Sequence, residues 1–492
     1  MVASPLILGI DLGTSSLKAV LYTDRMEQLC SVRRGYAPPG ASVTAEGWWQ
    51  ALLSALPELA GRAELSRVAC VSFSGYNAFV GVDRALRQTT PVMLYYNTAP
   101  CAYMGKLFQD CDGQYVFHRS CANLFGSGIM APGIRWLRDQ QSEAYASTDC
   151  FLFSNGYVAA RLTGQRTMDA SRASLTALHD PRGAALTWDE DLCRFFGISP
   201  AKLPAIKNCW EAVGTVTPEA ASVTGLPAGI PVAVGSMDSL CAALGNGITG
   251  AEQMLDIGGS AGGLACVSDR PRAHARLYLS RYALPGRWCN NAPLMSSARL
   301  FDWFCEKLAP GLSMEDFIRA VDASPCFARG LMFLPYVGGA RYPYWSMDTQ
   351  GHFLHFSPEC TISDMARAVV EGLSCAYRSI LTDLEALGVP APQCIVAAGG
   401  DTRFGTWVQS RANYLRIPYH LNDTPEVSAK GAALLGANQI GLIPDLAAYL
   451  SAHASAHQIV EPEEPAAAFA EHYQAFQADC GLLYQHIPSR DW

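Results

Sequence analysis

The chain has 492 residues, of which half are apolar and 16% are charged, so it can bury the cores of two large domains or three small ones. Its formal net charge is −8 and no basic block occurs, which excludes nucleic acid as an expected partner. No run of about 18 apolar residues occurs, so no membrane-spanning helix is predicted.

The N-terminus and the cysteines indicate a cytoplasmic protein. The start, MVASPLILGID, lacks a basic segment, and its apolar run is too short for a signal peptide. None of the 17 cysteines lies within four residues of another, so no CxxC metal or redox motif exists. We therefore expect reduced thiols that pack as small hydrophobic side chains.

The first half of the chain mixes strand-like runs with helical patterns. Short aliphatic runs bounded by Gly, Pro or polar residues predict strands at Leu6–Ile10, Val68–Ser72 and Pro231–Val234. Helical patterns cover Trp48–Leu59, Gly133–Leu137 and Tyr157–Leu162. A further helix is expected to start in the TPEAA segment, with Thr217 as its cap and Pro218 as its first residue. Mixed strands and helices of this kind predict an α/β fold.

The first strand ends in GIDLGTSS, an acid followed by glycine and hydroxyl residues. A tight turn of Gly13, Thr14 and Ser15 would present backbone N–H groups and hydroxyls, which bind phosphate oxygens. An ordinary hairpin turn has the same composition and stays an alternative. Asp11 favours the phosphate loop, because an acid beside bound phosphate requires a cation between them, typically Mg²⁺. No GxxxxGK[ST] motif occurs, which excludes a P-loop.

A second acid follows a strand-like run in VAVGSMDSLCAALGNG at 232–247. Asp238 ends the strand and precedes a helical pattern of small residues. Near phosphate loops, such an acid suits a general base that takes a proton from a substrate hydroxyl. The same position suits a helix N-cap, for which Asp is a favoured residue, and this alternative stays open.

A Gly-rich segment, ALGNGITGAEQ at 243–253, interrupts the pattern and is expected to act as a hinge. The pattern then restarts with MLDIGGSAGGLACVS. DLGTSS at 11–16 and DIGGSA at 256–261 share D-[LI]-G-x-S, and each lies between aliphatic strands. Because the two copies begin the two halves of the chain, they predict a duplicated core.

The second half contains a long helix and a glycine-rich strand end. Apolar residues from Ala366 to Leu384 fall at helical spacing. The strand Cys394–Ala398 runs into Gly399 and Gly400, and a helical pattern follows as far as Leu415. A helix N-terminus at this place would meet an anion or the ribose edge of adenosine, whereas a plain turn is the alternative.

The order and spacing of several blocks resemble one family. GIDLGTSSLKAVLY and MLDIGGSAG are similar to its two phosphate loops, and VAVGSMDSLCAALGNG to the segment with its catalytic aspartate. IVAAGGDTRFGTWVQSRANYLRIPY is similar to its adenosine-binding block, and ARLTGQRTMDASRASLTALHD and EVSAKGAALLGA to further blocks. This is the FGGY family of carbohydrate kinases. The resemblance implies a two-lobed, actin-like (ribonuclease H-like) ATPase fold with a duplicated βαβ core and a central cleft, with lobes at 1–246 and 247–492.

The resemblance also assigns roles to residues of this chain. It makes Asp238 the general base, although Ser239 stands where the family usually has Asn, and it makes Asp11 the acid that organises Mg²⁺. The resemblance assigns phosphate contacts to two loops and one lysine, namely Gly13, Thr14, Ser15, Lys18, Gly258, Gly259 and Ser260. It assigns nucleotide contacts to Gly399, Gly400 and Asp401. Asp256 stands where relatives often have Ser or Thr, and we expect it to join the magnesium shell or to bond backbone N–H groups.

The sugar site departs most from the family pattern. In SFSGYNAFVGVD at 72–83, Tyr76 and Asn77 stand where xylulose kinases have SGQMHG and glycerol kinases have Gln-Arg-Glu. In LYYNTAP at 94–100, Tyr96 and Asn97 stand where many relatives have Trp-Asn-Asp, and ordinary loop packing is their alternative role. We expect these four residues and Asp238 to bind the substrate. Because buried polar groups recognise hydroxyls sharply, the replacements should change specificity.

The expected function is ATP-dependent phosphorylation of a hydroxyl of a small sugar or polyol, with Mg²⁺. The alternative is a catalytically quiet protein of the same fold that senses sugar or nucleotide, and the altered sugar residues keep it open. The expected partners are ATP and the sugar, without nucleic acid or membrane. A homodimer is implied by the resemblance alone.

Overall fold

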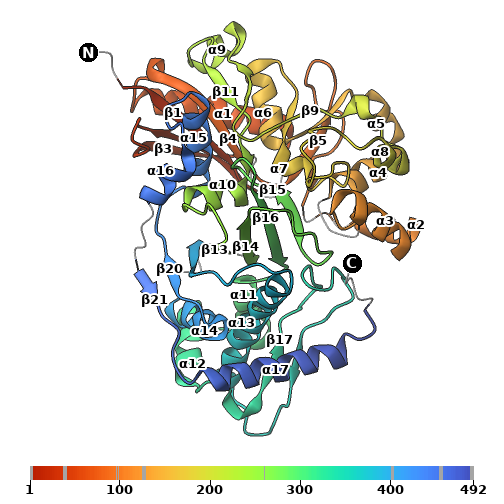
Figure 1. Cartoon of the computed structure of the whole chain (residues 1–492), viewed down its shortest axis with the longest axis vertical. Helices are drawn as coiled ribbons and strands as arrows, with labels where there is room; N and C mark the ends of the chain where they lie inside the picture. Colours follow the sequence, from red (N-terminus) through yellow and green to blue (C-terminus); the bar gives the residue numbers. More distant parts are fainter. Residues whose placement is uncertain are drawn as a thin grey trace. The chain divides into compact units, whose positions relative to one another are not determined.

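The computed structural model describes residues 4–36, 42–95, 97, 99–124, 129–259, 261–399, 404–453 and 458–487 (Figure 1). The chain forms two compact units. The first comprises Met1–Thr249, Leu279–Trp288 and Thr424–Ala454, and the second comprises Gly250–Tyr278, Cys289–Asp423 and Ser455–Trp492. A segment from late in the sequence therefore belongs to the first unit.

The large sheet of the first unit has the strand order β10-β11-β4-β1-β2-β3, and β12 also pairs with β4. Its strands are β1 (Leu6–Leu12), β2 (Ser16–Tyr22), β3 (Gln28–Gly35), β4 (Val68–Gly75), β10 (Ala212–Thr215), β11 (Pro231–Ala233) and β12 (Ser236–Met237). β1 runs antiparallel to β2 and parallel to β4. The three strands predicted in the first half are confirmed as β1, β4 and β11.

The helices predicted in the first half are also confirmed. They are α1 (Ala45–Ala60), α4 (Met130–Gln140), α6 (Ser154–Thr163) and α9 (Pro218–Thr224). The Thr217 side chain caps α9 by accepting from the N–H of Ala220, and Pro218 is its first residue. The other helices are α2 (Ala99–Leu107), α3 (Asp110–Ser120), α5 (Ser142–Ser147), α7 (Ala170–Ala173), α8 (Glu190–Phe196), α10 (Asp238–Gly245), α15 (Val427–Gln439) and α16 (Leu446–Ala452). Short strands complete this unit: β5 (Ala78–Val82), β6 (Met93–Leu94), β7 (Cys150–Phe153), β8 (Thr167–Asp169) and β9 (Ala205–Lys207).

Successive residues of β1 face two different helices. Leu6, Leu8 and Ile10 pack in one hydrophobic core with residues of α1. Gly9 points the other way, toward α15, where an added Cβ would lie 2.4 Å from the carbonyl oxygen of Ala429 (Figure 1). Because side chains alternate along a strand, burial on both faces explains why this run is continuously apolar.

Helices α10 and α15 touch through their backbones at Gly431. A Cβ at this position would lie 1.9 Å from the carbonyl oxygen of Cys241, so Gly431→Ala must push the two helices apart. We expect the substitution to lower the free energy of unfolding by about 1–3 kcal/mol, seen as a lower thermal midpoint. Gly105→Ala in α2 is the control, because its Cβ would meet open space, and it should not destabilise the protein. Equal midpoints for Gly431→Ala and the wild type would contradict this packing.

The sheet of the second unit repeats the arrangement around β1. Its strands run in the order β15-β16-β14-β13-β19-β20-β21, where β15 is Tyr278–Arg281, and β13 is antiparallel to β14 and parallel to β19. These strands are β13 (Gln253–Gly258), β14 (Gly262–Ser268), β16 (Trp288–Leu294), β19 (Cys394–Gly399), β20 (Tyr419–Leu421) and β21 (Gln458–Val460). β13 thus has the place in this sheet that β1 has in the first. The predicted duplication of the core is confirmed.

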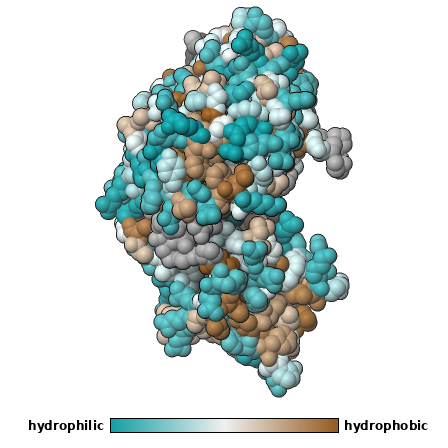
Figure 2. Space-filling model, turned by 90° about the vertical axis from the view of Figure 1, so that its right-hand side faces the viewer, coloured by the Kyte–Doolittle hydropathy of each residue, from teal (hydrophilic) through white to brown (hydrophobic). Residues whose placement is uncertain are grey.

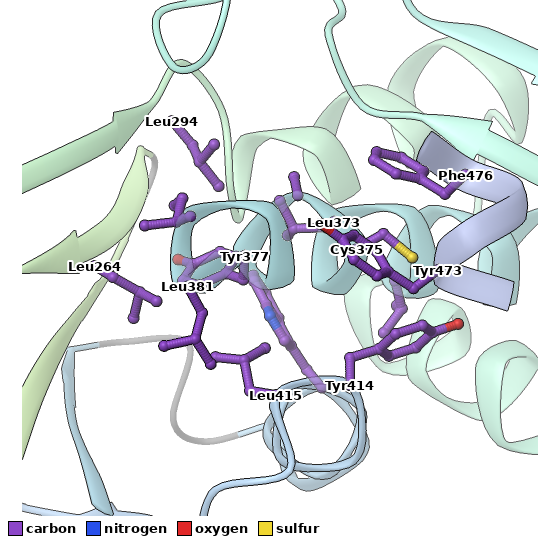
Figure 3. Close-up of a cluster of buried hydrophobic side chains, with 14 of the residues drawn as sticks. Leu264, Leu294, Leu373, Cys375, Tyr377, Leu381, Tyr414, Leu415, Tyr473 and Phe476 are labelled. Carbon is purple, nitrogen blue, oxygen red and sulfur yellow. The ribbon is translucent and has the colours of Figure 1, made fainter. Parts of the chain in front are cut away.

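The core of the second unit surrounds α13 (Ile362–Ala386), the long helix predicted from its apolar spacing. Figure 3 shows Leu373, Tyr377 and Leu381 of this helix among buried side chains of the sheet and of α17, such as Leu264 and Phe476. The remaining helices are α11 (Arg299–Trp303), α12 (Met314–Ala323), α14 (Gly405–Leu415) and α17 (Ala466–Leu483). The remaining strands, β17 (Met332–Leu334) and β18 (His352–Leu354), pair with each other.

Hydrophilic residues cover most of the face drawn in Figure 2, with hydrophobic residues in smaller patches. Within the described ranges, no helix has the length and apolar content needed to cross a bilayer. Most of the described cysteines are buried, Cys70, Cys241 and Cys289 among them. Burial raises the pKa of the Cys70 thiol to about 12, so it packs as a small hydrophobic group.

Candidate active site

The carboxyl ends of three neighbouring strands bring the predicted acids together. Ser74 of β4 pairs with Asp11 of β1 on one side and with Ser236 of β12 on the other. Both pairings are parallel, so the turn after β1 and Asp238 after β12 start from the same edge of the sheet. In α/β sheets this edge is the usual place for ligands.

Asp11 is buried, with 7% of its surface exposed. The hydroxyl of Ser74 donates to its Oδ1 at 2.8 Å, and the Nζ of Lys18 lies 4.0 Å from its Oδ2. Burial raises the pKa of Asp11, whereas the bonds and charges of Ser74 and Lys18 oppose that rise. A small cation beside Oδ2 would further favour the ionised carboxylate.

Lys18 is held by an acid from late in the chain. Its Nζ lies 2.6 Å from an Oε of Glu426, which directly precedes α15. The sequence did not predict this ion pair, because Glu426 appeared there only as the first residue of the EVSAKGAALLGA block. The predicted phosphate contact of Lys18 stays a prediction.

The turn between β1 and β2 is compact and leaves its hydroxyl residues accessible. The N–H of Gly13 donates to the carbonyl oxygen of Ser16 at 3.0 Å, which closes the turn. Thr14 and Ser15 are exposed at its tip. The turn is therefore a hairpin whose exposed hydroxyls could also bind phosphate. The two alternatives, an ordinary hairpin turn and a phosphate loop, are compatible.

Asp238 is the first residue of α10 and does not cap it. The residue before the helix is Met237, and the Oδ1 of Asp238 accepts from the adjacent N–H of Ser239 at 2.7 Å. Desolvation raises the pKa of Asp238 to about 6, the charge of Asp11 adds to the rise, and the charge of Arg172 opposes it. The N-cap alternative is therefore wrong, and a carboxylate that titrates near neutral pH faces this edge of the sheet.

A buried polar cluster lies behind Asp238. Arg172 of α7 is 1% exposed, and it donates through Nη2 to the carbonyl oxygen of Gly75, the last residue of β4. Its Nε lies 3.8 Å from Asp169, and the hydroxyls of Ser171 and Ser236 are 2.9 Å apart. Our sequence interpretation did not single out these residues. Asp169, Ser171 and Arg172 lie in the TMDASR stretch of one block that resembles the family, and Ser236 lies in the block that contains Asp238.

The predicted sugar-binding residues have different surroundings. Tyr76 is buried, and its ring packs edge-on against Trp48 with 6.3 Å between the ring centroids. Asn77 and Asn97 are half-buried, and the Oδ1 of Asn97 accepts from the N–H of Ala99 at 3.1 Å. Tyr96 lies outside the described residues. The substrate contacts of all four stay predictions.

In the second unit, the glycines of two predicted loops meet at one sheet edge. Gly258 of β13 pairs with Gly399 of β19 in parallel register, and Gly259 is half-buried beyond the strand. The carbonyl oxygen of Gly259 accepts from the N–H of Ala298 at 3.0 Å. Ser260, Gly400 and Asp401, which we also predicted here, lie outside the described residues.

Asp256 forms a buried ion pair that we did not predict. Its Oδ2 lies 2.6 Å from Nη1 of Arg411, and its Oδ1 accepts from the hydroxyl of Tyr377 at 3.0 Å. The guanidinium of Arg411 lies over the rings of Tyr377 and Trp407, at 4.1 and 4.7 Å from their centroids. We expected a magnesium contact or bonds to backbone N–H groups, but both carboxylate oxygens bind side chains far away in the sequence. The structure therefore gives Asp256 a role in the core of the second unit.

Solved structures share this fold along nearly the whole chain. Gluconate kinase from Lactobacillus acidophilus superposes with a TM-score of 0.92 at 20% identity, covering 99% of each chain. Xylulose kinase from the same organism gives a TM-score of 0.91 at 21% identity, covering 98% of this chain and 99% of that one. The fold is the two-domain, actin-like fold of ATP-dependent kinases, as predicted. The chain belongs to the FGGY family of carbohydrate kinases, because the models of the family's N-terminal and C-terminal domains match residues 6–245 and 257–440.

Relatives of known name match at modest identity. Xylulose kinase from Bacillus subtilis (strain 168) is 26% identical over 449 residues, which cover 88% of this chain and 87% of that one. Gluconokinase from the same organism is 26% identical over 461 residues, which cover 89% and 88%. This protein is accordingly a carbohydrate kinase, which transfers a phosphoryl group from ATP to a hydroxyl of a small sugar or polyol.

Proposed function

We propose that Asp238 is the general base of this kinase and that Asp11 organises Mg²⁺ beside the phosphates of ATP. The observation that carries the proposal is the shared sheet edge of the two acids, where the pKa of Asp238 is raised to about 6. Near neutral pH such a carboxylate is largely ionised and still basic enough to accept a proton.

The surroundings of Asp11 fit magnesium. Its Oδ1 accepts from the hydroxyl of Ser74, while among the described residues its Oδ2 has only the amine of Lys18 nearby, at 4.0 Å. Mg²⁺ in kinases is commonly held by one or two carboxylates together with substrate phosphates and waters. When bound, the ion would neutralise charge that develops on the phosphate oxygens.

The residues of the first unit support a direct transfer. Asp238 takes the proton of the substrate hydroxyl as its oxygen attacks the terminal phosphorus of ATP, and the bond from that phosphorus to the bridging oxygen of ADP breaks. The N–H groups and hydroxyls of Thr14 and Ser15 and the amine of Lys18 hold the phosphoryl oxygens. The products are the sugar phosphate and ADP, and the proton leaves from Asp238 to solvent.

Arg172 is proposed as a positioning residue that keeps Asp238 ionised. Its positive charge opposes the rise in the pKa of Asp238, so Arg172→Met should raise that pKa further. The acidic limb of the kcat/KM profile should then move to higher pH, because a larger fraction of Asp238 is protonated at each pH below neutrality. Arg172→Lys retains the charge and should leave the limb closer to its wild-type position. An acidic limb that stays in place in the Met variant would contradict this role.

A substrate panel tests the proposed function. ADP release with Mg²⁺-ATP is measured for ketoses, aldoses, polyols and sugar acids, including xylulose and gluconate because relatives are named for kinases of these compounds. A sugar that raises turnover well above the sugar-free rate, with loss of that increase in Asp238→Asn, would support the proposal. Tight nucleotide binding with a flat panel would favour the quiet sensor instead.

We further propose two functional lobes, 1–246 with the base and the sugar site and 247–492 with the second phosphate loop and the adenosine site. The buried, protonated thiols support a cytoplasmic location for the protein. The homodimer rests on the family resemblance, and sedimentation of the full chain would test it.

A further inference from the structure

A cavity of about 320 Å³ lies within the first unit, beside the start of α7. Its walls come from the ends of three separate segments, near residues 182–184, 208–210 and 281–288. The arginine, amide and aromatic side chains that line it are Arg182, Arg281, Arg287, Asn208, Trp210, Tyr282 and Trp288. None of the described residues that line it is acidic.

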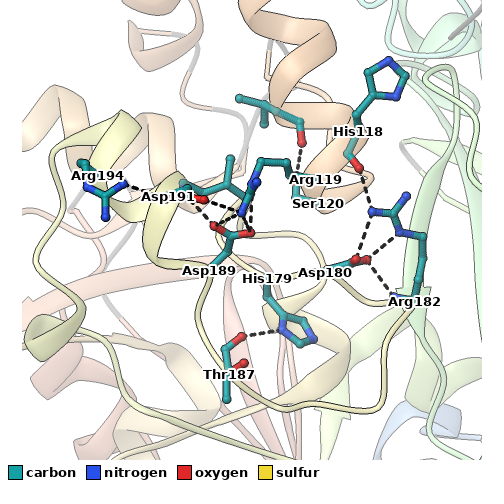
Figure 4. A network of polar contacts seen from close by, with 12 residues as sticks. His118, Arg119, Ser120, His179, Asp180, Arg182, Thr187, Asp189, Asp191 and Arg194 are labelled. Atoms are coloured by element: carbon teal, nitrogen blue, oxygen red, sulfur yellow. Dashed lines mark hydrogen bonds and ion pairs between the residues drawn. The ribbon is translucent and has the colours of Figure 1, made fainter.

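The arginines of this cavity are only partly neutralised. Arg182 donates to both carboxylate oxygens of Asp180, at 2.8 and 3.0 Å, and to the carbonyl oxygen of His118 (Figure 4). Asp180 itself does not line the cavity. Arg281 and Arg287 form no ion pair with any residue that the structure describes. The three arginines carry three positive charges, and Asp180 neutralises one of them. Two positive charges therefore remain at the cavity.

Arg281 is built firmly into the cavity wall. Its backbone N–H donates to the hydroxyl of Ser174 at 3.1 Å, and its Nη2 donates to the carbonyl oxygen of Gly183. Its Nε is buried without a hydrogen-bond partner among the described residues. Because an unsatisfied buried donor costs free energy, the protein itself satisfies the guanidinium of Arg281 only in part.

Two tryptophans give the cavity flat apolar walls. Trp288 is fixed because its Nε1 donates to the carbonyl oxygen of Pro181 at 2.7 Å. Trp210 is half-buried on the segment that also carries Asn208. Indole faces pack well against the C–H surface of a small ring, while an amide such as that of Asn208 can bond hydroxyls.

We propose that this cavity binds the phosphate monoester of a small sugar. A phosphate monoester carries nearly two negative charges at neutral pH, which matches the two uncompensated arginine charges. Guanidinium groups bind phosphate oxygens in pairs, and the tryptophan walls suit the sugar. The volume admits one such molecule. The residues that line it do not include the 13–15 turn, Asp11 or Asp238, and its occupation does not depend on the proposed roles of these two acids.

Calorimetric titration of the full chain with ribose 5-phosphate tests this site. Saturating Mg²⁺-ADP is present throughout, so that the nucleotide site does not contribute. We expect saturable binding of ribose 5-phosphate and none of unphosphorylated ribose. Arg281→Gln and Arg287→Gln should each weaken binding tenfold or more, because each removes a charge-assisted contact. Arg84→Gln is the matched control, since Arg84 is an exposed arginine of the same unit, and it should bind as the wild type does.

Arg287→Gln keeps the test decisive if Arg281→Gln fails to fold, because no side-chain hydrogen bond of Arg287 supports the structure among the described residues. Absence of saturable binding would overturn the proposal. So would binding that both variants leave unchanged, or inorganic phosphate binding as tightly as ribose 5-phosphate. Because no turnover is measured, a failure here is distinct from a failure of the kinase mechanism.

Discussion

Asp238→Asn is expected to lower kcat for phosphoryl transfer by roughly 10²–10⁴-fold, the usual contribution of a general base. Asparagine has nearly the same size as aspartate but cannot accept the hydroxyl proton. Mg²⁺-ATP should bind to the variant about as well as to the wild type, because the loss concerns proton transfer alone. The measurement is the initial rate of ADP release at saturating sugar, together with calorimetric nucleotide binding.

The stability of this variant separates a chemical effect from a structural one. Burial raises the pKa of Asp238, so the ionised carboxylate is less favourable in the folded protein than in water. A neutral side chain removes that cost, and the thermal midpoint of Asp238→Asn should equal or exceed that of the wild type. Asp24→Asn, in the turn after β2, is a control that should retain full activity. Near-normal turnover in Asp238→Asn would show that another group is the base.

Asp256→Asn should lower the free energy of unfolding of the second unit by about 3–5 kcal/mol, the usual effect of breaking a buried ion pair. The variant leaves the guanidinium of Arg411 buried among Tyr377 and Trp407 without its carboxylate. The measurement is the thermal midpoint of the full chain by scanning calorimetry.

Two further variants show whether the uncompensated charge is the cause. Arg411→Met in the background of Asp256→Asn removes that charge, and part of the lost stability should return. Glu385→Gln breaks a more exposed pair with Arg378 in the same unit and should have little effect. If the double variant is less stable than Asp256→Asn by the full cost of losing Arg411, the ion-pair explanation is wrong.

Much of the secondary structure could be predicted because its causes are local. The aliphatic run Leu6–Ile10 became β1, and the spacing from Ala366 to Leu384 became the buried face of α13. Thr217 caps α9 because a hydroxyl beside Pro218 can accept from the N–H of Ala220. The strand ends were less accurate, since β1 and β4 continue to Leu12 and Gly75 through polar residues that have partners across the sheet.

The candidate site was predicted in part. The repeated D-[LI]-G-x-S pattern indicated Asp11 and the duplicated core, and the end of a short strand indicated Asp238. Arg172 and Glu426 were missed, because their importance comes from neighbours across the fold. The residues of the pair Asp256–Arg411 are 155 positions apart in the sequence, and those of the pair Lys18–Glu426 are still further apart.

The sequence by itself determined the α/β class, the glycine turns and the acids that follow the strands, because backbone propensity, alternation and turn chemistry act over a few residues. Only the tertiary structure decided where each acid lies and which groups surround it. Parallel pairing of β1 and β12 with β4 brings Asp11 and Asp238 to one edge of the first sheet, whereas Asp256 forms an ion pair with Arg411. The same local motif therefore has different electrostatic surroundings in the two units, since desolvation and ion pairing depend on contacts made through space.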